Sequence, residues 1–124
     1  MRSNYNFTIV GDTLVIKLQP KHDVIAGLLI ELTTEFSFNH VRETCHKVMT
    51  GEIDAEEVGK NQYRASIMKD KTTVYNELNF KLIPEDQESA TLTTADFKKY
   101  LDIWWSGYNY WKETGKVPKS GSIS

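Results

Sequence analysis

The sequence predicts an α+β fold in which helices pack on one face of an antiparallel β-sheet, in the order β-β-α-α-β-β-α. Two pairs of segments have apolar residues at every second position. This pattern predicts β-hairpins, because successive side chains of a strand point to opposite faces. Three other segments repeat apolar residues at steps of three and four, the period of an amphipathic helix. The hairpins supply the sheet, and the helices supply its cover.

The first hairpin is predicted around Gly11-Asp12. Apolar residues alternate on both sides of this dipeptide, with Tyr5, Phe7 and Ile9 before it and Leu14, Ile16 and Leu18 after it. A glycine followed by aspartate suits a two-residue hairpin turn. Pro20 ends the second strand, since proline has no N–H to donate to a β-ladder.

Two helices are predicted next. Asp23 can cap a helix that starts at Val24, and the apolar spacing of residues 24–36 fits a helix better than a strand. Gly27 is a weak helix former, so a buried strand stays the alternative for this segment. A second helix follows an N-cap at Ser37 or Asn39 and ends at Gly51.

The second hairpin joins strands at residues 63–67 and 74–80 through the turn KDKT, and we expect it to pair with the first. Two polar stretches flank this hairpin. EIDAEEVGKN, residues 52–61, is expected to be an ordered loop or one short turn. PEDQESATLTT, residues 84–94, is expected to be a polar loop.

The last helix has the clearest start and end. Thr93 can cap it with Asp96 at the third position, Gly115 can close it and Pro118 stops its continuation. Its apolar stripe is expected to face the sheet and consists of Phe97, Leu101, Trp104, Tyr108 and Trp111. Trp105 and Tyr110 fall outside this stripe. We expect one domain over residues 1–117 and a flexible tail over residues 118–124.

Composition restricts the classes of function. The 124 residues carry a net charge of −2, which argues against a nucleic-acid partner. No apolar run approaches the ~20 residues that cross a bilayer, so no membrane association is expected. The N-terminus lacks the apolar region of a signal peptide, and Cys45 has no second cysteine to pair with. These features predict a cytoplasmic protein.

No catalytic, phosphate-binding or metal-binding motif is found in the sequence. The three histidines, His22, His40 and His46, are scattered and are interpreted as surface residues. Cys45 lies on the apolar side of its helix and is interpreted as a core residue. We therefore expect no catalytic residue, no metal and no cofactor.

Two acidic groups and one tryptophan are the candidate partner-binding residues: Asp54, Glu56, Glu57, Glu85, Asp86, Glu88 and Trp105. The acidic loops are either ordinary solvated loops or a footprint for a basic partner, since complementary charge speeds association. Trp105 is either part of the packing or an anchor, because exposed tryptophans are enriched at interface hot spots.

The chain also resembles a family in its pattern of segments: HDVIAG after a strand, FNHVRETCHKVMTGE as a helix, QYRASIMKDKTTVYNELNF as a hairpin and TTADFKKYLDIWWSGYNYW as the closing helix. This layout is similar to bacterial immunity proteins of contact-dependent growth inhibition and related polymorphic toxin systems. The resemblance implies a small cytosolic protein that binds and neutralises one cognate toxin domain, commonly a nuclease. It implies no catalytic residue, and no contact residue can be carried over from it.

Two other functions stay open at this point. The chain can be a housekeeping protein that forms a homodimer through a sheet edge or its aromatic helix. It can also bind a small ligand in an aromatic-lined pocket.

Overall fold

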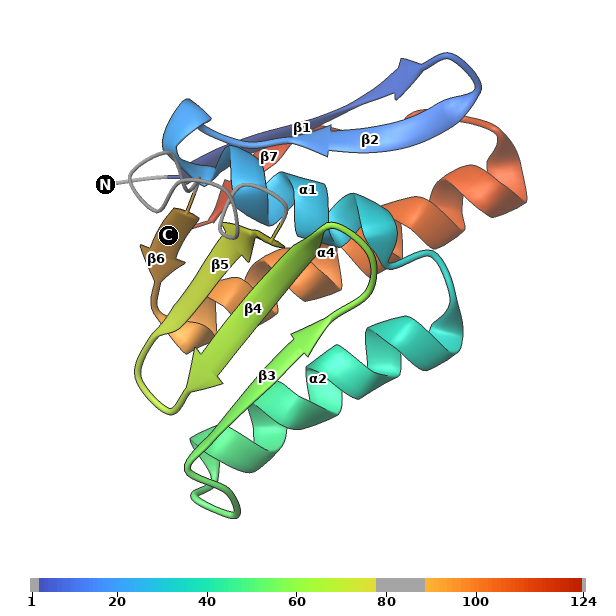
Figure 1. The fold of residues 1–124 in the computed structure, drawn as a ribbon. Helices are drawn as coiled ribbons and strands as arrows, with labels where there is room; N and C mark the ends of the chain where they lie inside the picture. The colour runs from blue at the N-terminus through green and yellow to red at the C-terminus, as the bar shows by residue number, and fades with distance from the viewer. Residues whose placement is uncertain (1–2, 78–88, 124) are drawn as a thin grey trace.

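The structure is a computed structural model that describes residues 3–77 and 89–123 and confirms the α+β class (Figure 1). The strands are β1 Ser3–Val10, β2 Thr13–Lys17, β3 Ala55–Gly59, β4 Tyr63–Met68, β5 Thr72–Asn76, β6 Ser89–Leu92 and β7 Gly121–Ile123. The helices are a short 3-10 turn η1 Pro20–His22, then α1 Asp23–Glu31, α2 Glu35–Met49 and α4 Thr94–Thr114.

The strands form two antiparallel sheets instead of the single sheet that we expected. One has the order β2-β1-β7 and the other the order β3-β4-β5-β6. Helix α1 contacts β2 of the first sheet and β4, β5 and β6 of the second (Figure 1). Its residues Val24, Ile25, Leu28 and Leu29 are all buried, so apolar side chains leave this helix toward both sheets. A helix buried in this way keeps the two hairpins apart, which is why they do not pair.

The first hairpin confirms the expected turn. Phe7 lies opposite Ile16 and Val10 opposite Thr13, so Gly11 and Asp12 form a two-residue loop. Gly11 has φ +66°, which only glycine adopts at little cost.

The segment after this hairpin is helical, which settles the alternative for residues 24–36 in favour of helix over most of its length. Gly27 has a packing role: a Cβ at this position would lie 2.4 Å from the Tyr63 ring. Helix α2 begins earlier than expected, because Thr34 is the N-cap. Its hydroxyl accepts from the Ser37 N–H at 3.1 Å, and the Ser37 hydroxyl accepts from the Thr34 N–H at 3.4 Å.

Three strands were not expected. Residues 55–59 form β3 instead of a loop, residues 89–92 form β6 and residues 121–123 form β7. Residues 121–123 of the expected tail thus pair with β1, and the flexibility of the tail stays a prediction. Gly121 pairs with Tyr5 of β1, and Ile123 is buried, since its aliphatic side chain packs into the core.

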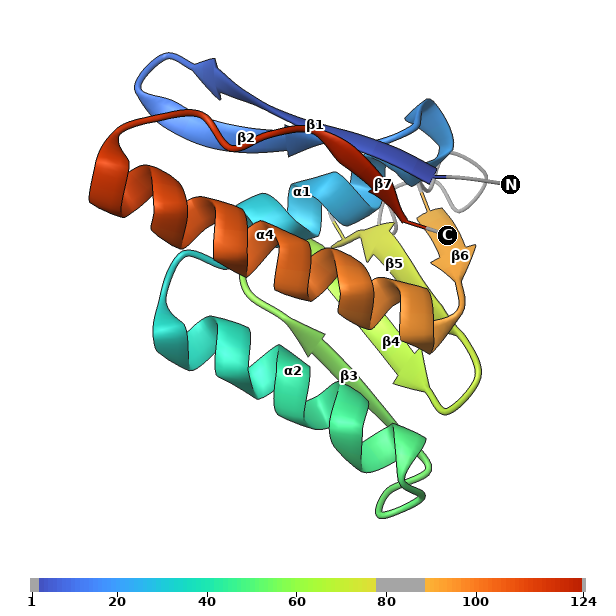
Figure 2. The ribbon, with the colours of Figure 1, turned by 180° about the vertical axis from the view of Figure 1, so that it is seen from behind.

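Helix α4 confirms the predicted cap and end. The Thr93 hydroxyl accepts from the Asp96 N–H at 3.1 Å, and Gly115 closes the helix with φ +73°. Figure 2 shows α4 and α2 side by side, with the four-stranded sheet behind them. The Trp104 indole N–H donates to the Leu32 carbonyl at 2.9 Å, which satisfies an acceptor at the end of α1. No helix in the described part of the chain is both long and apolar enough to span a bilayer.

Candidate functional site

The edge of the four-stranded sheet carries two of the predicted acidic residues. Asp54 precedes β3, and Glu56 lies within it. Both side chains are exposed, and neither forms an ion pair with another described residue. Among the described residues β3 pairs with β4 alone, so its opposite edge has no described strand partner, while helix α2 packs against β3 (Figure 1). Asp54 and Glu56 therefore place two uncompensated negative charges along an open strand edge.

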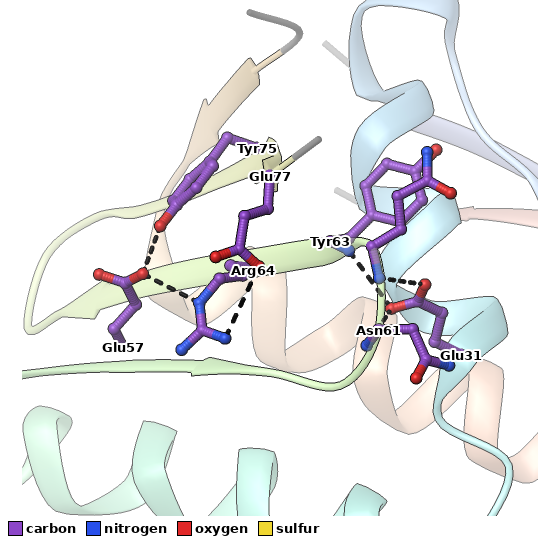
Figure 3. A network of polar contacts seen from close by, with 8 residues as sticks. Glu31, Glu57, Asn61, Tyr63, Arg64, Tyr75 and Glu77 are labelled. Carbon is purple, nitrogen blue, oxygen red and sulfur yellow. Dashed lines mark hydrogen bonds and ion pairs between the residues drawn. The ribbon is translucent and has the colours of Figure 1, made fainter. Parts of the chain in front are cut away.

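Glu57 differs from its neighbour because its charge is already compensated. On the outer face of the sheet, one oxygen of its carboxylate accepts from the Arg64 Nε–H at 3.0 Å and also from the Tyr75 hydroxyl (Figure 3). Arg64 also lies 3.9 Å from Glu77. Consecutive residues of a strand point to opposite faces, so Glu56 points away from this group.

The same contacts shift the titration of the network. The hydrogen bond from Tyr75 lowers the pKa of Glu57, and Arg64 adds to this effect. Burial, together with the hydrogen bond to Glu57, raises the pKa of Tyr75 to about 12. Glu57 is thus held ionised and tied to two neighbouring strands, an arrangement that fixes β3 on β4.

A second carboxylate fixes the turn between β3 and β4. Glu31, the last residue of α1, accepts hydrogen bonds from the backbone N–H groups of Asn61 at 3.3 Å, Gln62 at 2.9 Å and Tyr63 at 3.4 Å (Figure 3). Hydrogen bonds to an ionised carboxylate are stronger than those between neutral groups, so Glu31 holds the turn between β3 and β4 against the end of α1. We did not single out Glu31 from the sequence. Its only signal was an acidic residue that interrupts the apolar run VIAGLLIEL.

Trp105 does not join the acidic residues. Its ring stacks on Phe38 of α2 with the centroids 4.7 Å apart and the planes 6° apart, and it also stacks on Tyr108. Trp105 is half-buried, because α2 covers this second side of α4. Phe38 lies near the start of the 15-residue helix α2, whereas Asp54 follows its end. A helix of this length extends about 22 Å, so Trp105 and the β3 acids lie near opposite ends of α2.

The other predicted acidic group, Glu85, Asp86 and Glu88, lies outside the described residues. Its role as a binding surface stays a prediction.

The histidines and the cysteine lie in different environments. His40 and His46 are exposed as expected, but His22 is buried against the Tyr100 ring, with the ring centroids 6.1 Å apart. The prediction of a surface residue was wrong for His22, because the 3-10 turn before α1 directs it inward. Cys45 is buried in the core, and burial raises the pKa of its thiol to about 12. Within residues 3–77 and 89–123 no three His, Cys, Asp or Glu side chains converge as a metal site would require.

Comparison of the chain with protein-family models, curated proteins and solved structures found no match.

Proposed function

We propose that this chain is a non-enzymatic binding protein that neutralises a toxin domain in the cytoplasm by covering the surface with which the toxin acts. The observation that carries the proposal is the open edge of β3 with the uncompensated acids Asp54 and Glu56. The sequence resemblance to immunity proteins supplies the class of partner.

The strand edge supplies the means of attachment. An edge strand presents unpaired backbone N–H and C=O groups, which a strand of a partner can use to extend the sheet. Glu31 and Glu57 hold β3 and the turn that follows it in place before any partner arrives. Because the edge is already ordered, binding loses little conformational entropy at this edge.

The charges select the partner. If two copies of this chain paired through β3 about a two-fold axis, the acidic edge of one copy would face the same acids of the other. Like charges directly opposite each other on paired strands are destabilising. A toxin domain with a basic surface would instead be attracted electrostatically to the acids at this edge. The acids of β3 therefore favour a basic toxin over a homodimer through this edge.

The experiment is co-expression of the chain with the toxin domain encoded beside its gene. The wild-type chain is expected to protect the cells and to elute with the toxin in gel filtration. The double variant Asp54→Lys/Glu56→Lys reverses both exposed charges, so the Kd for the toxin is expected to rise more than about tenfold. Asp70→Lys, at an exposed residue of the turn between β4 and β5, is the matched control and is expected to bind normally.

Two results would overturn the proposal. Failure of the wild-type chain to protect, with no complex in gel filtration, removes the toxin as partner. Equal binding by the double variant and the wild-type chain removes the β3 edge as the contact surface.

A further inference from the structure

A groove on the opposite side of the molecule is independent of the β3 edge. It lies between β1, one face of α4 and the C-terminal segment, and it has a volume of about 610 Å³. Figure 2 shows this segment leaving the end of α4 and running back beside β1 to β7. Ligand sites in proteins commonly enclose roughly 300–1,000 Å³. The groove therefore has the size of a site for one small organic molecule.

The floor and the walls of the groove are apolar and aromatic. Tyr5 and Phe7 are two residues apart on β1 and so point to the same face of the strand. Their rings lie edge to face, with the ring centroids 6.0 Å apart. Ile103, Gly107 and Tyr110 come from α4 and recur at steps of three and four, so they share one helix face. Gly107 leaves room for Phe7, since a Cβ there would lie 2.5 Å from that ring.

Part of this apolar lining is accessible. Tyr110 keeps 44% of its surface exposed and Val117 keeps 46%. Pro118 forms part of the wall beside Val117 and fixes the backbone of the segment at that point. A flat apolar molecule inserted between Tyr110 and Tyr5 would remove this surface from water, and aromatic rings add favourable stacking or edge contacts.

The rim of the groove carries an unbalanced positive charge. Lys116 and Lys119 both line it, and neither forms an ion pair with another described residue. The acid at the rim, Asp102, is already engaged by Arg42 of α2 at 3.4 Å. The rim therefore keeps the positive charges of Lys116 and Lys119. An anionic group on a ligand would complement these two charges.

We propose that this groove binds an organic anion with a flat ring body, of the class of aromatic carboxylates and sulfonates. The ring lies against Tyr5, Phe7 and Tyr110, and the anionic group meets Lys116 and Lys119. The site goes beyond the proposed binding of a toxin and uses none of the residues of the β3 edge.

The test uses two fluorescent probes of similar shape. 1-Anilinonaphthalene-8-sulfonate is anionic, and N-phenyl-1-naphthylamine is its neutral counterpart. We expect the anionic probe to bind the folded wild-type chain with one-to-one stoichiometry and more tightly than the neutral probe. The double variant Lys116→Gln/Lys119→Gln is expected to lower the affinity for the anionic probe roughly fivefold, as the loss of two exposed charge contacts implies. The same variant is expected to leave the affinity for the neutral probe unchanged.

Two further variants distinguish binding in the groove from non-specific binding of the probes elsewhere on the surface. Ser106→Phe places a large ring in the groove from an exposed position, so both probes are expected to lose binding while thermal unfolding shows the variant folded. Lys69→Gln/Lys71→Gln removes two exposed lysines from the turn between β4 and β5 and is expected to change nothing.

Three outcomes would overturn the inference: no saturable binding of either probe, unchanged binding in Ser106→Phe, or equal weakening by the two lysine pairs. Tighter binding of the neutral probe than of the anionic one would overturn the assignment of an anion.

Discussion

His22 illustrates at the scale of one residue how burial sets a titration. The residue is 9% exposed, and its Nδ1 has no hydrogen-bond partner among the described residues. Burial lowers the pKa of His22, the charge of Lys21 lowers it further, and Asp96 opposes the shift. The folded chain therefore holds His22 neutral at a pH where an unfolded chain would begin to protonate it.

This burial predicts a dependence of stability on pH. The unfolded His22 titrates near 6.5 and the folded one below that value, so the unfolded chain binds the proton first as the pH falls. The free energy of unfolding is expected to be full well above pH 6.5 and to decrease as the pH falls through 6.5. Urea unfolding across this range measures the decrease, and His22→Gln is expected to abolish most of it.

His40→Gln is the control, because His40 is exposed on α2 and its side chain forms no ion pair with another described residue. That variant is expected to keep the wild-type slope. A slope in His22→Gln as steep as in the wild-type chain would contradict the role of His22.

At the scale of elements, the helix α4 was the most predictable part of the fold. It is 21 residues long, its apolar residues keep the helical period, and Thr93 and Gly115 mark its ends. The strands β3, β6 and β7 were missed, because each is short and buries one residue: Val58, Ala90 and Ile123 respectively. One buried residue creates no alternation, so only tertiary pairing reveals these strands.

The two candidate surfaces, the acidic edge of β3 and the groove, were less predictable from the sequence than helix α4, because both depend on tertiary contacts. The sequence located the acids at Asp54, Glu56 and Glu57, but it did not distinguish the two free charges from the one paired with Arg64 and Tyr75. That distinction depends on which residues face each other across β3, β4 and β5. The same holds for the groove, since only the folded chain brings Tyr5 of β1 and Tyr110 of α4 to the walls of one groove.

Gly107 gives a prediction for the contact between α4 and β1. In an exposed helix, replacing glycine with alanine stabilises by about 1 kcal/mol. Here the new Cβ would lie 2.5 Å from Phe7, whose ring is confined by Trp104 on one side and Tyr5 on another. Overpacking of this kind costs about 1–3 kcal/mol, so we expect Gly107→Ala to lower the free energy of unfolding in urea.

Ser106→Ala is the matched control, since Ser106 is the exposed neighbour of Gly107 on the same helix. It is expected to be neutral or slightly stabilising, because alanine is the better helix former. A gain of stability in Gly107→Ala equal to that in Ser106→Ala would show that Phe7 does not press on α4.

At the scale of the whole molecule, the two ends of the described chain are joined. β7 pairs with β1, so the segment 116–120 is anchored at Gly115 on one side and by the strand on the other. This closure forms the wall of the groove. It also adds a third strand to a hairpin, and an isolated hairpin is marginally stable in water.

Ile123 tests this closure, because it is the buried residue of β7. Removing its side chain in Ile123→Ala is expected to lower the free energy of unfolding by about 2 kcal/mol, at the low end for a buried isoleucine because the strand is short. Loss of the anchor also loosens residues 116–120, so the affinity for 1-anilinonaphthalene-8-sulfonate is expected to fall in the same variant.

Ser122→Ala changes the exposed neighbour that lies opposite Asn4, and it is expected to leave both properties unchanged. If Ile123→Ala matched Ser122→Ala in both measurements, β7 would not be what holds the groove closed. If stability alone fell, residues 116–120 would keep their position without the strand β7, and the closure would not be what forms the wall of the groove.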